Sequence, residues 1–213
     1  MSPCLPHGVK TDNPSHQKCN MDRNCPEHYR EPSAKHSLES TKELINYIRS
    51  LNSDLIHPVL TPRFAISCTS ELLRSLGDMA ELDETLAIQT HIAENKGEIV
   101  FTKELFKGCK SYADLYDQHG LLCERTILAH AVHLDDHELE LVKKAGAGIS
   151  HCPTSNFNLR SGMANVGEML DRGIKVAHGS LHLWQELRRT HGERASRDGQ
   201  SGDLEHARRV FTQ

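Results

Sequence analysis

The sequence predicts an α/β protein built on a parallel sheet. Short apolar segments alternate with amphipathic helical patterns along most of the 213 residues. The apolar segments recur at roughly 25 to 40 residue spacing, which is typical of βα units that form parallel sheets. A chain of this length can also bury the apolar core that such a sheet requires.

The N-terminal half begins with a segment of little periodicity. Residues 1–36 are rich in proline and cysteine, and we expect loop or extended chain there, with 1–17 unstructured. Ser37 and Thr69 each precede an apolar repeat of helical period, so both are expected N-caps. The expected elements of this half are a helix at 37–51, a strand at 57–61, a helix at 69–80, a strand at 85–91 and a helix at 94–106.

The C-terminal half repeats the pattern. Asp135 and Glu138 have capping-box spacing, and Gly146 is placed to end the helix that they start. The expected elements are a helix at 112–118, a strand at 125–130, a helix at 135–146, a strand at 148–151, a helix at 166–170 and a strand at 174–177. The pattern is lost from Leu181, so we expect one domain over 18–180 and a divergent polar tail over 181–213.

Composition excludes several classes of protein. No run of about 18 apolar residues exists, which argues against a transmembrane helix. The first 20 residues lack the apolar stretch of a secretory signal. A formal net charge of −4 argues against a nucleic-acid partner. Seven cysteines without a signal indicate reduced thiols in a cytoplasmic protein.

Histidine is unusually frequent, with 15 residues, and four of them follow predicted strands. His91, His130, His151 and His178 stand at carboxyl ends, which meet at one edge of a parallel sheet. Neutral imidazoles there suit Zn²⁺ or Fe²⁺. The alternative for each one is a histidine held by hydrogen bonds in the mouth of the sheet.

Two further motifs lie at strand ends. Glu94 comes three residues after His91, where a carboxylate can exchange protons with water on a metal held by that histidine. Alternatively, Glu94 is a helix-start glutamate favoured by the helix dipole. Arg63 and Phe64 offer a guanidinium beside an aromatic ring, suited to a planar polar ligand, although an ordinary loop salt bridge explains the arginine equally well.

Several segments together carry a family resemblance. In chain order they read CNMDRN from Cys19, LTPRF from Leu60, THIAEN from Thr90, LAH from Leu128 and SHCPTSN from Ser150. They resemble segments of guanine deaminases, members of the amidohydrolase superfamily, and the similarity runs from about Lys18 to Gly179. TPRF together with THIAEN is fairly specific for this group, whereas HCPTSN is shared with related aminohydrolases.

The resemblance implies part of a (β/α)₈ barrel of the TIM type, covering about its fourth to eighth strands. It implies zinc-dependent hydrolysis of guanine to xanthine and ammonia, a step of purine catabolism, and pairing of chains as a homodimer. By the same resemblance His91 and His130 would bind the metal and Glu94 would shuttle protons. Arg63 and Phe64 would hold the purine.

The chain departs from the family pattern at its two ends. No H-x-H pair occurs, and Leu181 stands where the family has the aspartate of a Gly-Thr-Asp run. The segments that form the family's small β-sandwich are also missing. We therefore expect a truncated form of such a deaminase. The alternative hypothesis is a non-catalytic product that at most associates with a full-length deaminase. A deaminase acting on another purine or on a triazine ring is less favoured because of TPRF.

Overall fold

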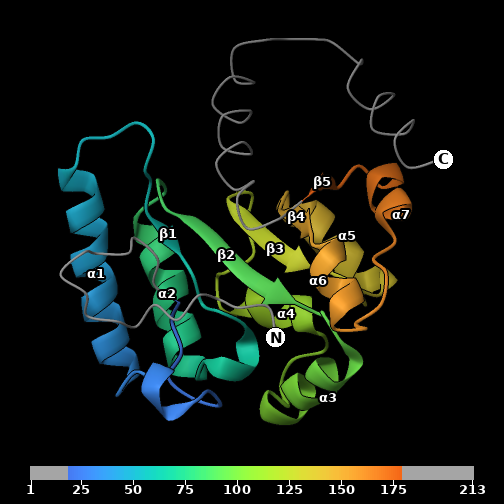
Figure 1. Ribbon diagram of the computed structural model, residues 1–213, viewed down its shortest axis with the longest axis horizontal. Helices are drawn as coiled ribbons and strands as arrows, with labels where there is room; N and C mark the ends of the chain where they lie inside the picture. The colour runs from blue at the N-terminus through green and yellow to red at the C-terminus, as the bar shows by residue number, and fades with distance from the viewer. Residues whose placement is uncertain (1–18, 179–213) are drawn as a thin grey trace.

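The computed structural model describes residues 19–178. The predicted segments 1–17 and 181–213, and the position of Leu181, lie outside them. Within these residues, five strands form one sheet in the order β1-β2-β3-β4-β5, and every neighbouring pair is parallel (Figure 1). The strands are β1 (Val59–Leu60), β2 (Ala87–Ile92), β3 (Thr126–His130), β4 (Gly148–His151) and β5 (Lys175–His178). The predicted parallel α/β architecture is confirmed.

Helices connect the consecutive strands, as parallel pairing requires. Figure 1 shows α1 and α2 beside β1, and α5, α6 and α7 beside β4 and β5. The α-helices are α1 (Ala34–Ser50), α2 (Ser70–Leu82), α3 (Lys96–Leu105), α4 (Tyr112–Gln118), α5 (Asp136–Ala145), α6 (Pro153–Asn158) and α7 (Val166–Asp171), and two 3-10 turns are η1 (Glu27–Tyr29) and η2 (Ala65–Ser67). None of the helices among residues 19–178 is long and apolar enough to cross a membrane.

One face of the sheet packs on the helices and forms the core. Along β2, Ile88 and Ile92 are fully buried, whereas Gln89 and His91 on the other face are partly exposed. Apolar side chains from α2, α4 and α5 complete the core, among them Leu72, Leu76, Leu115, Leu139 and Val142. The second face of β2 therefore carries polar groups, and His91 is one of them.

The capping signals are mostly confirmed. Thr69 accepts a hydrogen bond from the backbone of Leu72 at the start of α2. Asp135 and Glu138 form both halves of a capping box before α5, and Gly146 ends that helix with a left-handed φ of 69°. These short-range signals depend on a few neighbouring residues, which is why the sequence displays them.

Two local expectations were wrong or incomplete. Helix α1 begins at Ala34 after the cap Ser33, not at Ser37. Ser37 lies inside the helix and is buried, where its hydroxyl accepts a hydrogen bond from the side-chain amide of Asn20 at 2.7 Å. Helix α6 was not predicted, because its six residues are too few to show an apolar period.

Candidate active site

His91 and His130 lie side by side at the carboxyl ends of β2 and β3. Their rings stack with centroids 5.1 Å apart and planes 25° apart. His130 is paired in register with Ile92, whose side chain faces the core. The His130 ring nevertheless contacts His91, which lies on the other face of β2. The left-handed φ of 75° at His130 breaks the alternation of the strand. Such backbone is strained for a non-glycine residue, so the surrounding structure must hold it in place.

Both imidazoles are oriented through Nδ1. The Nδ1 of His91 lies 2.7 Å from the Arg63 carbonyl oxygen, and that of His130 lies 2.8 Å from Oδ1 of Asn156. Both oxygens act as acceptors, so each Nδ1 carries a hydrogen, and the neutral form of each ring has its lone pair on Nε2. Desolvation lowers the pKa of His91 to about 4, and the nearby His130 lowers it further, against the opposing effect of the hydrogen bond to the Arg63 carbonyl. His91 is therefore neutral near pH 7, the form that binds metals.

Glu94 directs its carboxylate towards this pair, with the Oε1 atom buried. Its Oε1 lies 3.5 Å from Nδ1 of His130, and the glutamate side chain is 18% exposed. Among the described residues that oxygen has no hydrogen-bond partner. The Glu94 backbone is held separately, because its N–H donates to Oε2 of Glu98 at 2.9 Å. A fixed backbone, and a buried oxygen that accepts no hydrogen bond from the described residues, leave this carboxylate ready to accept or donate a proton.

Arg63 and Phe64 lie in the loop that follows β1. The Arg63 guanidinium carbon is 5.4 Å from the centre of the Phe64 ring. The Phe64 ring approaches His91 edge-on, with centroids 6.3 Å apart. The structure thus brings all five predicted site residues together at the carboxyl edge, where loops of parallel sheets supply functional groups.

Sequence reasoning did not assign a role to several neighbours of this cluster. Asn156 orients His130. It belongs to the HCPTSN run, and this motif was the only sign in the sequence that Asn156 could have a role in the site. His151 and His178 meet edge to face, with ring centroids 5.4 Å apart. Desolvation lowers the pKa of His151, and the nearby His178 and His130 add to the effect. These two histidines line the same edge, one and two strands further along.

The donor chemistry fits zinc only in part. His91 is neutral near pH 7, and in both His91 and His130 an oxygen holds Nδ1, which leaves Nε2 as the ligand atom, the arrangement typical of zinc ligands. Catalytic zinc takes three protein ligands. Within residues 19–178, no group of three or more His, Cys, Asp or Glu side chains is arranged to hold a metal. The described residues thus supply two ligands that fit and do not complete a centre.

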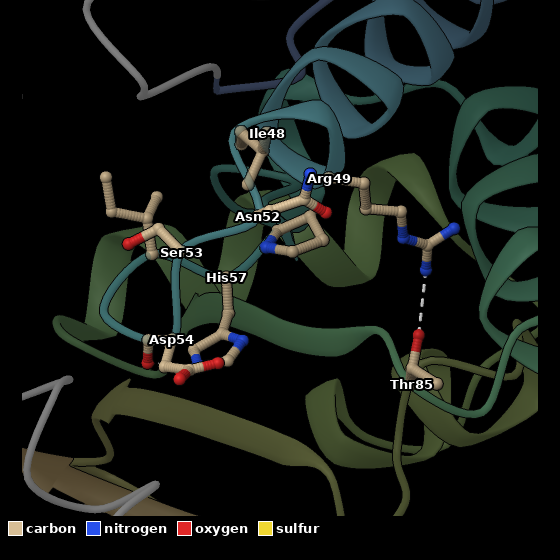
Figure 2. Close-up of a pocket in the computed structure, with 9 residues that line it drawn as sticks. Ile48, Arg49, Asn52, Ser53, Asp54, His57 and Thr85 are labelled. Atoms are coloured by element: carbon tan, nitrogen blue, oxygen red, sulfur yellow. Dashed lines mark hydrogen bonds between the residues drawn. The ribbon is translucent and has the colours of Figure 1, made fainter.

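A separate hollow lies at the opposite edge of the sheet. It has a volume of about 330 Å³ and lies between the end of α1 and the segments leading into β1 and β2 (Figure 2). Arg49, Thr85 and His57 line it, and the Arg49 guanidinium donates a hydrogen bond to the hydroxyl of Thr85 at 2.8 Å. Pro58 and Thr85 precede their strands, so this hollow is remote from the cluster at the carboxyl ends.

A parallel sheet in sequence order, with its polar cluster at the carboxyl edge, defines an α/β protein of the class whose active sites occupy that edge. The chain belongs to the amidohydrolase family, whose profile matches residues 15–196. This match includes the whole of the described sheet and all five residues of the cluster.

The relatives that the chain resembles include guanine deaminases. The chain is 54% identical over 165 residues to a probable guanine deaminase of Schizosaccharomyces pombe, which is 76% of this chain and 31% of that protein. A solved guanine deaminase from C. acetobutylicum, with guanine bound in its active site, has 41% identity and a TM-score of 0.73, covering 76% of this chain and 38% of that one. The chain spans about a third of the length of the curated relatives it matches.

A more distant structure shares the fold alone. An adenosine deaminase from Xanthomonas campestris, solved with bound zinc, is 20% identical with a TM-score of 0.67 and covers 76% of this chain and 35% of that one.

Proposed function

We propose that this chain provides the purine-binding and proton-transferring part of a zinc-dependent guanine deaminase. The reaction is hydrolysis of guanine to xanthine and ammonia. The observation that carries the proposal is the convergence of His91, His130, Glu94, Arg63 and Phe64 at one edge of the sheet. Similarity to guanine deaminases over 76% of the chain supports guanine as the substrate.

In this proposal His91 and His130 hold the metal through Nε2, with the remaining ligands outside the described residues. When bound, zinc supplies a Lewis acid that makes water a competent nucleophile near neutral pH. The five strands correspond to about the fourth to eighth strands of a (β/α)₈ barrel, without the family's small β-sandwich. Their consecutive order in one parallel sheet supports this placement.

The chain's own side chains perform the remaining steps. Phe64 presents a ring face to the planar purine, and Arg63 donates hydrogen bonds to it, which together fix its orientation. Glu94 accepts a proton from the attacking water and delivers it to N3 of the ring. It then takes the second proton, from the hydroxyl now on the ring carbon, and delivers it to the departing amine as the C–N bond breaks and the carbonyl forms. Its Oε1 suits this role because it is buried and has no hydrogen-bond partner among residues 19–178.

The full chain, supplied with Zn²⁺, should be assayed for loss of guanine absorbance with xanthine as the product. Glu94→Gln is the decisive variant, since it keeps the shape and removes the proton acceptor. We expect turnover to fall by about 10²–10⁴-fold. Equal turnover in the two proteins would contradict the role of Glu94. The matched control is Glu104→Gln, an exposed position on α3, which should retain activity.

A second candidate is a non-catalytic chain that at most associates with a full-length deaminase. It is favoured by the presence of only two fitting ligands among the described residues. Metal analysis separates the candidates, because a catalytic chain should retain zinc near one equivalent and a non-catalytic chain only a trace. Light scattering on the same sample tests the predicted homodimer. The predicted cytoplasmic location requires imaging of the tagged chain.

A further inference from the structure

Helix α4 places two buried tyrosines behind the candidate site. Tyr112 and Tyr116 lie one turn apart, with ring centroids 5.3 Å apart and at most 1% exposure. Both hydroxyls accept a hydrogen bond from the backbone N–H of Ala65, at 3.2 Å and 3.0 Å. Ala65 directly follows Arg63 and Phe64, so the two tyrosines support the loop that carries these residues.

The hydroxyl of Tyr116 also reaches the end of β2. It donates to the His91 carbonyl at 2.8 Å and lies 2.9 Å from Oγ1 of Thr90. A phenol has one hydrogen to donate and accepts through its oxygen. Because the Tyr116 hydroxyl donates its hydrogen to the His91 carbonyl, its oxygen accepts hydrogen bonds from both Thr90 and Ala65. Burial raises the pKa of Tyr116, so the hydroxyl keeps the hydrogen that it donates.

We infer that Tyr116 is a positioning residue that locks the end of β2 against the loop after β1, and so sets the place of His91 relative to Arg63. Two hydrogen bonds join these segments directly, since the Arg63 carbonyl accepts from the His91 backbone N–H at 3.0 Å and from its Nδ1 at 2.7 Å. Tyr116 bridges the same two segments from the core side. The inference rests on the proposed function for the roles of His91 and Arg63.

The helix that carries Tyr116 is itself anchored at both ends. At its start, Oε1 of the buried Glu138 accepts from the backbone N–H groups of Tyr112 and Ala113, at 2.9 Å and 3.1 Å. Just past its end, the His119 carbonyl packs against Gly77 of α2 so closely that a Cβ there would lie 1.8 Å from the oxygen. An anchored helix gives Tyr116 a fixed position from which to act.

The test is Tyr116→Phe in the full 213-residue chain, with Tyr112→Phe as the matched control. Each variant keeps its ring, and each leaves Ala65 one tyrosine partner, but only Tyr116→Phe removes the contact with His91. Amide hydrogen exchange is measured without metal or substrate, at His91 and at reference amides of β4. We expect the His91 amide of Tyr116→Phe to exchange about fivefold faster relative to the references, the effect of one lost hydrogen bond.

A purely structural role makes a different prediction. Lower global stability would accelerate His91 and the β4 amides together, and equal acceleration in both variants would overturn the inference. If Tyr116→Phe fails to fold, Thr90→Val is tested in its place, because it removes a hydrogen-bond donor to Tyr116. We expect it to speed hydrogen exchange at the His91 amide selectively. An unchanged exchange rate of that amide would also overturn the inference. Hydrogen exchange can be measured without enzymatic turnover. A chain that is inactive but shows the expected faster exchange at His91 would therefore contradict the proposed function and support the positioning role of Tyr116.

Discussion

Replacing Gly77 by alanine should destabilise the fold severely. Gly77 lies inside α2 where α4 ends, and a Cβ at this position would lie 1.8 Å from the carbonyl oxygen of His119 and 3.3 Å from the carbonyl carbon of Gly120. Both neighbours are backbone atoms and cannot rotate away as a side chain would. The substitution therefore requires α4 to move as a unit from α2.

The magnitude follows from two opposing effects. Overpacking of a well-packed region costs about 1–3 kcal/mol, and a clash with backbone belongs at the upper end of that range. Alanine stabilises a helix interior by about 1 kcal/mol relative to glycine. The net loss is about 2 kcal/mol. With a urea m-value of about 2 kcal/mol/M, the unfolding midpoint falls by about 1 M.

Urea unfolding followed by circular dichroism measures this midpoint. The matched control is Gly97→Ala in α3, where an added Cβ would meet only the side-chain oxygen of Asn95, at 3.4 Å. We expect that control to unfold at or slightly above the wild-type midpoint. A Gly77→Ala protein as stable as the control would refute the close approach of α2 and α4, and with it the anchoring of α4.

Three other perturbations have defined outcomes. Hydrogen bonds from Thr85 and Arg49 hold the pKa of Asp83 below its usual range, so its ionised form stabilises the fold. In urea titrations the free energy of unfolding of wild type should exceed that of Asp83→Asn by up to ~1 kcal/mol at pH 7, and the difference should shrink as the pH falls below the usual aspartate pKa and through the lowered one. Burial raises the pKa of Cys68 to about 12, and a thiol reagent at pH 8 should label it only after denaturation. Glu138→Ala leaves buried N–H groups unpaired and should cost about 3 kcal/mol by calorimetry; a loss under 1 kcal/mol would show that water replaces the carboxylate.

Local patterns predicted most elements but not how each is used. The caps of α2 and α5 were readable because each involves a side chain and a backbone group three residues away. Ser37 was mistaken for a cap because its partner, Asn20, is 17 residues distant and invisible to a local pattern. For the same reason Asn156 had no assigned role, since its contact with His130 joins residues 26 apart.

The sequence by itself determined the parallel α/β architecture, the family resemblance and the five residues of the candidate site, because periodicity and motifs are properties of neighbouring residues. Only the tertiary structure decided that His130 turns to stack on His91, that both imidazoles are held through Nδ1, and that Glu94 has a buried unpaired oxygen. It also decided that Tyr116 lies behind them. Each of these features depends on packing between segments that are distant in the sequence. Strand register and local backbone conformation fix those distances, and they cannot be calculated from residue spacing along the chain.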